Sequence, residues 1–487
     1  MPKLEASCAT IPEREPSSNI DFATRVVSIH GESLSPDHTV RNRHVGTTSP
    51  STSGQSPSLL STLISQDILI CTTIDLLAAN EGRPSFIKFE QDVEHPFVTP
   101  YDPANWTTFK QHAVGIALRS TIVTTAILAA QECFQSRRLG LSHTGPIATY
   151  KMGWAMLDSA ISSTDVDQDI DILFITTFLL SLVEVLVPGE IRPRLLDLSC
   201  GPLVERLREW SLDRDPRSST SLRLTAWMLI SHAAARRSGN SGLLCPHIRD
   251  LLEQACGHGF PLAPVQASFD VSSDVSILAT LTEPLFAFYF QLQLLSTQVA
   301  DLSHYHRSRT TGEDQEEVSS LMAELKSQIM LLWHSRPSLL HLEPEELYAQ
   351  FTSRTIAEPL VLLAILCVLA YHTEIVELGR NLSAEQVPTN EAIEHLAQMR
   401  SILTSMKLPP CFLRALFLYS IESMGGDLKA DSDWAVSRML EIKDPVYYSD
   451  FFANFAKGLS DKQRQKERRV TTKWWCLEEF GINPPYL

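Results

Sequence analysis

The residues with the most obvious chemical potential lie in one short segment. Two cysteines and two histidines occur there close together: Cys245, His247, Cys256 and His258. Thiolate and imidazole groups are the ligands that a tetrahedral zinc ion takes. The spacing of these four residues matches none of the common zinc motifs, and an ordinary helix from about Pro246 to Ala255, capped by Gly257, accounts for them. We therefore predict no metal site in this segment.

No residue stands in a sequence pattern typical of catalysis. The chain lacks the GxxxxGK[ST] loop that holds phosphates, the GxGxxG turn that holds dinucleotides, the HExxH helix of zinc proteases and the GxSxG turn of serine hydrolases. His304 and His306 flank Tyr305, and we interpret this group as part of a solvated loop. We expect no catalytic residues, no metal ligands and no cofactor, so the sequence predicts that the protein is not an enzyme.

One dense basic run, KQRQKERR, covers residues 462–469. It is either a nuclear address or the solvated face of a helix, and the acids within and beside it favour the helix face. A smaller basic group, RNRH, covers residues 41–44. Trp474 and Trp475 follow the longer run and precede further apolar residues. We predict that both tryptophans anchor a terminal helix to the core rather than stack on nucleic-acid bases.

The composition limits the class of protein and its partners. The chain has 487 residues, of which 44% are hydrophobic and 20% are charged, so it can bury a sizeable core. This length exceeds the roughly 250–300 residues that one core usually serves, which predicts two lobes or one large helical array. The formal net charge of -16 repels a phosphate backbone, so we expect weak or no direct DNA binding by this chain.

The sequence points to a reduced compartment inside the cell. The first 20 residues contain no apolar run that could serve as a signal peptide, and the nine cysteines are scattered at irregular spacing. The glycosylation patterns at Asn105 and Asn381 are therefore interpreted as chance matches. The longest apolar stretches, at residues 172–187 and 360–371, are shorter than the roughly 20 residues that a membrane span needs, so we expect no membrane association.

The character of the sequence changes near residue 58. Residues 1–57 are rich in serine, threonine, proline and charge, and we expect a disordered tail because they offer little apolar surface to bury. In residues 58–487 apolar side chains recur at helical spacing, and no long alternating pattern indicates a strand. We therefore expect an all-α domain there, a large irregular array or bundle of many helices.

The segment at residues 311–337 illustrates how a helix is predicted. Thr311 stands three residues before Asp314, as in a capping box, and Pro337 ends the segment. Between them, five apolar residues recur in steps of three and four and so share one helix face: Val318, Leu321, Leu325, Ile329 and Leu332. The same reasoning predicts helices near residues 59–79, 105–136, 146–162, 170–187, 193–210, 219–237, 244–256, 275–300, 357–379, 390–405, 409–424, 431–440 and 446–469.

Three segments are apolar on nearly all sides. They cover residues 170–187, 275–300 and 357–371. We predict that these helices form the central layer, because neighbouring helices must cover every one of their faces. No repeat of fixed period with shared signature residues is present, so a regular solenoid is not predicted.

Five stretches of the sequence carry a family resemblance. The first is NWTTFKQHAVGIALRSTIVTTAILAAQECF, followed by the tyrosine helix TYKMGWAMLDSAI, and the second is DILFITTFLLSLVEVLVPGE. The third, RLTAWMLISHAAARRSGNSGLL, contains a tryptophan helix with a trailing arginine. The fourth and fifth are MLLWHSRPSLL and LPPCFLRALFLYSIESMGGDLKADSDWAVSRML. Their order over about residues 105–480 resembles the middle and C-terminal regulatory region of fungal zinc-cluster transcription factors.

The resemblance implies a helical regulatory or dimer-related domain. The family's DNA-binding unit holds two zinc ions with six closely spaced cysteines, usually near the N-terminus, whereas here only Cys8 precedes Cys71. That unit is absent from the sequence. The resemblance therefore implies either a truncated gene model or a paralogue that acts through partners.

The expected function is nuclear regulation of transcription without a DNA-reading module. The expected partners are other transcription factors or co-regulators, in a homodimer or heterodimer, and an unidentified small-molecule effector in a pocket between helices. A cytoplasmic helical interaction scaffold is the alternative, and an enzyme of helical fold without a standard motif is a further one.

Overall fold

Helices form almost all of the regular structure in the described part of the chain. The computed structural model describes residues 86–162, 169–197, 201–212, 218–257, 264–265, 273–306, 312–382, 387–404, 408–424 and 429–487. All of them belong to one unit, Leu76–Leu487. These residues contain no β-strand, and an isolated bridge pairs Pro188 with Ile191. The all-α fold is confirmed, whereas the predicted tail and the predicted helix near 59–79 lie outside the described residues.

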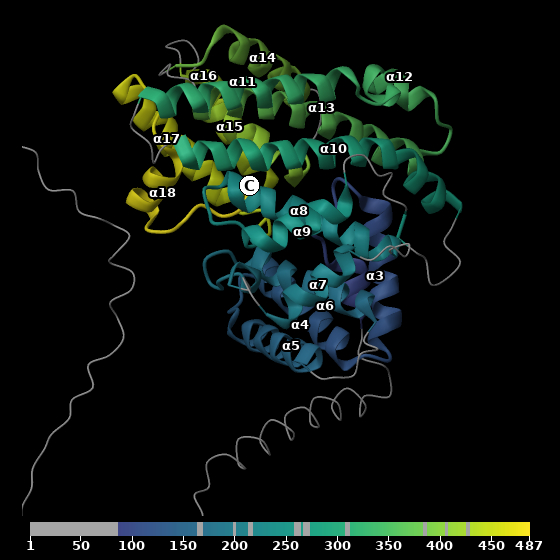
Figure 1. The fold of residues 1–487 in the computed structure, drawn as a ribbon. Coiled ribbons are helices and arrows are strands. Elements are labelled where there is room, and N and C mark those ends of the chain that lie inside the picture. Colours follow the sequence, from purple (N-terminus) through teal and green to yellow (C-terminus); the bar gives the residue numbers. More distant parts are fainter. Residues whose placement is uncertain are drawn as a thin grey trace, which may run out of the picture. The chain divides into compact units, whose positions relative to one another are not determined.

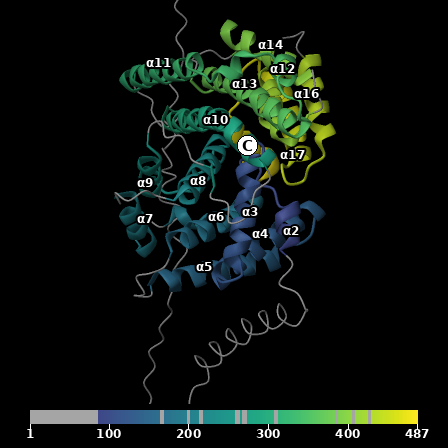
Figure 2. The same ribbon diagram turned by 90° about the vertical axis from the view of Figure 1, so that its right-hand side faces the viewer.

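The first half of the described chain consists of eight α-helices, drawn in purple and teal in Figures 1 and 2: α2 (Ile87–Asp92), α3 (Pro103–Ala117), α4 (Thr121–Leu139), α5 (Thr144–Ser162), α6 (Ile170–Leu186), α7 (Pro202–Leu212), α8 (Ser219–Arg237) and α9 (Pro246–Cys256). Residues 105–136, predicted as one helix, form α3 and α4. Ser120 interrupts them because it adopts an extended backbone and caps α4, accepting a hydrogen bond from Val123 N. Residues 193–210 likewise divide into a 3-10 turn, Arg194–Leu196, and α7.

The second half of the described chain consists of nine α-helices: α10 (Ser273–His306), α11 (Gly312–His334), α12 (Pro344–Ala349), α13 (Arg354–Leu382), α14 (Asn390–Thr404), α15 (Leu413–Glu422), α16 (Lys429–Ile442), α17 (Ser449–Lys466) and α18 (Thr472–Phe480). Because α10 extends past its predicted end, His304 and His306 lie in a helix, and the prediction of a loop is wrong. α11 ends three residues before Pro337, as the sequence predicts. Helices α10, α11 and α13 pack side by side (Figure 1).

Two groups of buried apolar side chains hold the helices together. The larger group spans α2 to α13, and the smaller group spans α13 to α18. Helix α13 contributes to both, because Leu363 and Cys367 belong to the larger group while Leu366 and Leu369 belong to the smaller one. Adjacent faces of one helix therefore join the two groups.

The predicted central helices are buried to different extents. Every side chain of α6 from Leu173 to Leu186 is buried, as the sequence predicts. Helix α13 is also largely buried, since both apolar groups pack on it. Helix α10 packs on α8, α11 and α13, yet Ile277 near its start is exposed. The prediction that α10 is covered on every side is therefore too strong.

By length and composition alone, two helices in the described part of the chain are apolar enough to cross a membrane. They are the segments Ser273–Ser303 of α10 and Arg354–Arg380 of α13, and each is longer than the apolar stretches noted in the sequence. In the fold these two helices pack against each other. Burial inside a helical core calls for the same apolar composition, so their packing accounts for it.

A buried polar network fixes α3, α8 and α10 relative to one another. Asp102, at the start of α3, accepts hydrogen bonds from Trp227 Nε1 at 3.0 Å and Asn105 Nδ2 at 2.8 Å. Arg223 Nε lies 3.3 Å from Asp102, and Arg223 Nη2 lies 2.5 Å from Glu283. Asn105 is therefore a buried core residue, which agrees with the interpretation of its glycosylation pattern as a chance match.

Candidate functional site

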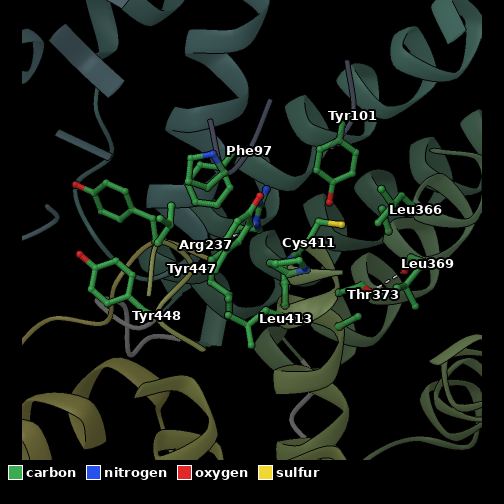
Figure 3. A pocket seen from close by; sticks show the side chains of 18 of the residues that line it. Phe97, Tyr101, Arg237, Leu366, Leu369, Thr373, Cys411, Leu413, Tyr447 and Tyr448 are labelled. Carbon is green, nitrogen blue, oxygen red and sulfur yellow. Dashed lines mark hydrogen bonds between the residues drawn. The ribbon is translucent and has the colours of Figure 1, made fainter. Parts of the chain in front are cut away.

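A cavity lies among elements that are far apart in the sequence. Its wall is formed by the segment before α3, the end of α8, α10, α13, the start of α15, the turn before α17 and the last two residues. Its lining side chains come from both apolar groups of the core. Figure 3 shows Arg237 between Tyr101 and Cys411 on one side and Tyr448 on the other. The volume open to the centres of water molecules is about 60 Å³.

Aromatic side chains form much of the cavity wall. The rings of Tyr101 and Tyr289 stack with their centroids 3.6 Å apart. Tyr101 and Tyr447 lie deep inside the protein but keep accessible surface, and both line the cavity. Burial raises the pKa of both phenols well above its ordinary value. Their hydroxyl groups therefore stay neutral near pH 7 and remain able to donate hydrogen bonds.

Arg237, the last residue of α8, places a guanidinium in the same wall. It also lies deep in the protein while keeping accessible surface. Burial lowers its pKa, and the nearby guanidinium of Arg414 lowers it further, although the carboxylates of Glu374 and Glu377 act in the opposite direction. Even a lowered arginine pKa leaves the group charged at neutral pH. The cavity therefore holds a permanent positive charge.

Arg414, near the start of α15, is the second cation of the wall. Its Nη1 donates to Glu374 Oε1 at 2.6 Å and its Nη2 donates to Glu377 Oε2 at 2.5 Å. Burial lowers the pKa of Arg414, but these two carboxylates outweigh that effect and raise it overall. Both acids belong to α13, so the ion pairs fix Arg414 and hold α15 against α13.

The described lining residues include one thiol. Cys411 is the cavity's thiol, and burial raises its pKa to about 12. The thiol stays protonated at neutral pH and is a poor nucleophile in that form. The described residues that line the cavity include no histidine and no aspartate or glutamate, and the terminal oxygen of Leu487 lies 3.3 Å from Arg237 Nε. What the cavity offers is an arginine, neutral phenols and apolar walls.

A second cavity adjoins the first through shared residues. Arg237, Arg414 and Leu487 line both cavities. The second has about 80 Å³ open to the centres of water molecules and is lined additionally by three basic side chains: Arg236, Arg380 and Lys473. Glu377 lines the second cavity as well, and the carboxylates of Asp301, Glu422 and Glu374 pair with Arg236, Arg380 and Arg414, so most of these positive charges are compensated.

The two cysteines among the potential zinc ligands are not brought together. Helix α9 starts with Pro246 and is capped by Gly257, whose φ of 62° suits glycine, so the predicted helix is confirmed. Cys245 and Cys256 are buried at opposite ends of this helix, roughly 16 Å apart from the rise per residue. His258 lies outside the described residues. Among those that the structure describes, no three metal-ligating side chains form a group.

The basic run at residues 462–469 is partly built into the fold. Helix α17 covers its first part, and Gln463 is buried there. The side chain of Arg469 is directed into the protein, where its Nε donates a hydrogen bond to the buried Glu422 at 3.1 Å. The side chains of Lys466 and Arg468 are exposed. The interpretation as a solvated helix face therefore holds for only part of the run.

The two tryptophans after this run differ in their exposure to solvent. Trp475 is 6% exposed and stacks on Phe455 with centroids 5.4 Å apart, which confirms its prediction as a core residue. Trp474 is 69% exposed, so the same prediction is wrong for it. Successive residues of a helix point about 100° apart, and α18 rests on the core along one side.

Sequence reasoning did not identify the cavity. Its lining residues come from separate segments and share no motif, since Tyr101 and Arg414 are 313 positions apart by number. A partial signal existed in two of the stretches that resemble the transcription factors. The trailing arginine of the third stretch is Arg237, and the fifth stretch supplies Cys411 and Arg414.

Comparison with known proteins gives no match: no family model matches the sequence, and neither does a curated protein or a solved structure. The functional argument therefore depends on the geometry of the cavity and on the order of the five stretches.

Proposed function

We propose that this chain is a regulator of transcription that works in the nucleus through its helical domain, by protein contacts and by sensing a small molecule. It has no zinc-cluster DNA reader of its own in the sequence. The observation that carries the proposal is the cavity, in which two stretches of the resemblance meet through Arg237 and Arg414.

The position of the cavity suits an effector site. Its wall joins α8 and α10, which belong to the larger apolar group, to α15, which belongs to the smaller one, and to α13, which belongs to both. A ligand in this place contacts both groups at once. Its binding free energy therefore depends on how they pack, and it can shift the population of conformations that differ in that packing.

Protein contacts are supported by an exposed part of α11. Leu321, Met330 and Leu331 are exposed on this helix, and Leu331 reaches 69%. Met330 and Leu331 line the same shallow hollow of the surface, and adjoining exposed apolar side chains are typical of protein interaction sites. The same feature also supports the second candidate function, a helical interaction scaffold in the cytoplasm. The location of the protein in the cell therefore distinguishes the nuclear regulator from the scaffold.

A tethering experiment tests the proposal. The full chain, fused to a foreign DNA-binding domain in a fungal cell, should change transcription of a reporter or recruit a zinc-cluster factor that does so. The DNA-binding domain alone is the control, and a fluorescent fusion reports localisation. Exclusion from the nucleus, a silent reporter and no zinc-cluster partner in pull-downs would together replace the proposal with the cytoplasmic scaffold.

A further inference from the structure

Helix α11 lies at the outer edge of the helical array (Figures 1 and 2). It packs mainly on α10 and α13, and Val318, Leu325 and Ile329 are buried on that side. The other side of the helix bears a shallow hollow of the surface, which we call the α11 hollow. The residues that line it are Ala323, Lys326, Ser327, Met330, Leu331 and His334.

The α11 hollow has a half with small side chains and a half with large ones. Ala323 and Ser327 lie in its N-terminal half, whereas Met330, Leu331 and His334 lie in its C-terminal half. Leu331 is 69% exposed and Met330 is 38% exposed, so the large half presents apolar surface to solvent. A partner that fits this hollow therefore needs bulk opposite the small half and space opposite the large half.

A second copy of α11 meets this requirement when it runs antiparallel to the first. The positions 323, 327, 330 and 334 follow one another in steps of four, three and four, the spacing of a seam between two paired helices. They are also symmetric about the point between 328 and 329. A two-fold axis at that point places Met330 of each copy over Ser327 of the other, and His334 over Ala323. Each large side chain thus meets a small one.

The charges beside the hollow favour the same orientation. Glu324 is exposed next to Ala323, so in the antiparallel pair its carboxylate lies beside His334 of the second copy. His334 Nδ1 lies 2.6 Å from the carbonyl oxygen of Met330, which only accepts, so Nε2 is the nitrogen that can meet this carboxylate. In a parallel pair the two groups would be about 15 Å apart along the helix axis. Lys326 adds little repulsion because Glu391 of α14 pairs with it at 2.6 Å.

The length of the hollow limits the strength of such a contact. From Ala323 to His334 the helix rises about 16 Å. Two faces of this length bury less than the roughly 1,200 Å² of a standard stable interface. The dimer is therefore weak, and its population depends on the local concentration of the chain.

We propose that α11 is a self-association surface, on which the hollow of one copy receives the hollow of a second copy in an antiparallel pair. Met330 and Leu331 supply the apolar contacts, and Ala323 and Ser327 supply the space for them. The proposal rests on the protein-contact part of the proposed function. It goes further by naming the partner, a second copy of this chain, and the helix that binds it.

Sedimentation of the purified full chain tests self-association. The average mass should rise towards that of a dimer between about 5 µM and about 500 µM, the range in which a small interface forms. Leu331→Glu should weaken the dimer at least tenfold. Leu139→Glu is the matched control, because Leu139 at the end of α4 is 68% exposed but lies outside the hollow, and it should change nothing. Circular dichroism checks that both variants are folded.

Two results overturn the proposal. One is a chain that stays monomeric at every concentration. If a cysteine placed at Ala323 then also reacts slowly with a maleimide, another segment of the same chain covers the hollow. The other is a dimer that folded Leu331→Glu protein forms as readily as the wild type, because that dimer uses a different surface.

Cross-linking tests the orientation of the two helices. A chain with Ala323→Cys, mixed with a chain with His334→Cys, should be joined by a short bismaleimide much faster than either chain is joined to its own copy. In the antiparallel pair the unlike positions lie opposite each other, whereas the like positions are about 16 Å apart along the axis. The unmodified chain gives the background from the native cysteines. Faster cross-linking between like positions would overturn the antiparallel arrangement.

The outcomes separate this inference from the proposed function. A dimer that Leu331→Glu disrupts, together with a silent reporter and cytoplasmic localisation, would leave self-association standing and remove the role in transcription. An active reporter with a chain that is always monomeric would remove self-association and leave the role in transcription standing.

Discussion

Tyr150 donates a 2.6 Å hydrogen bond from its hydroxyl to Glu184 Oε1, and both side chains are buried between α5 and α6. The backbone N–H of Arg194 donates to the same oxygen at 3.0 Å. Glu184 Oε2 has no hydrogen-bond partner among the described residues. Burial raises the pKa of Glu184 from 4.5 to about 7, although the hydrogen bonds from Arg194 and Tyr150 lower it. The protonated carboxyl is therefore the form that the fold prefers.

This preference predicts a dependence of stability on pH. Because the pKa of Glu184 is higher in the folded chain than in the unfolded chain, its contribution is fully present below pH 4.5 and is lost as pH rises through about 7. The loss is on the order of 3 kcal/mol, at about 1.36 kcal/mol per pKa unit. Urea unfolding measured from pH 4.5 to 8 should show this slope, and Glu184→Gln should remove it. The exposed Glu478→Gln is the control; identical pH profiles for the wild type and Glu184→Gln would contradict the assignment.

The difference between Trp474 and Trp475 predicts different effects of substitution. Trp475→Ala should lower the free energy of unfolding by about 3–5 kcal/mol, because it removes a buried ring that stacks on Phe455. Trp474→Ala should change it by less than about 0.5 kcal/mol, since that ring is exposed. Gly458→Ala gives an independent test, because the added methyl group would lie 2.6 Å from Trp475 Cη2. Equal unfolding midpoints for the two tryptophan variants would contradict the structure.

Helix boundaries could be predicted from the sequence only where local residues mark them. Helix α9 was predictable because Pro246 and Gly257 are local signals at its two ends. The break between α3 and α4 was not, since apolar residues continue on both sides of Ser120 and a serine is common within helices as well as at their starts. The apolar residues that follow Trp474 and Trp475 likewise predicted a terminal helix anchored to the core, without telling which of the two tryptophans faces inward.

The cavity depends on packing that no local pattern records. Tyr101 and Tyr289 stack where the network of Asp102, Arg223 and Glu283 holds the start of α3 against α8 and α10. Arg237 is the last residue of α8, a helix whose sequence is typical of a protein core. Nothing in the sequence predicts that its guanidinium contacts Gln293 rather than an acid. The helical fold could therefore be predicted from composition and periodicity, whereas the site could not.

The placement of the cysteines predicts the metal content of the protein. Metal analysis of the purified full chain should give well under one zinc ion per chain, because Cys245 and Cys256 occupy opposite ends of α9 and cannot share one ion. Cys245→Ser should accordingly leave the metal content unchanged. Two zinc ions per chain, lost on treatment with a chelator together with the helical signal, would show that ligands outside the described residues build a site.

The last prediction concerns Glu422, which is fully buried at the end of α15. It accepts hydrogen bonds from Arg380 of α13 and from Arg469, and Arg469 also donates to the carbonyl oxygen of Gly379 at 3.0 Å. One carboxylate thus compensates two guanidinium groups. Glu422→Gln would remove the buried carboxylate that these two guanidinium groups share, and breaking a buried ion pair in this way typically costs roughly 3–5 kcal/mol.

Urea unfolding of matched variants measures this effect. Glu441→Gln, which breaks the exposed pair between Arg438 and Glu441, should cost less than about 1 kcal/mol. Arg469→Gln and Glu422→Gln should not be additive, because the two side chains are in contact and either substitution alone already breaks their ion pair. If Glu422→Gln had the same unfolding midpoint as Glu441→Gln, solvent would reach the ion pair between Arg469 and Glu422. Arg469 would then be accessible as part of a basic surface run rather than a structural residue.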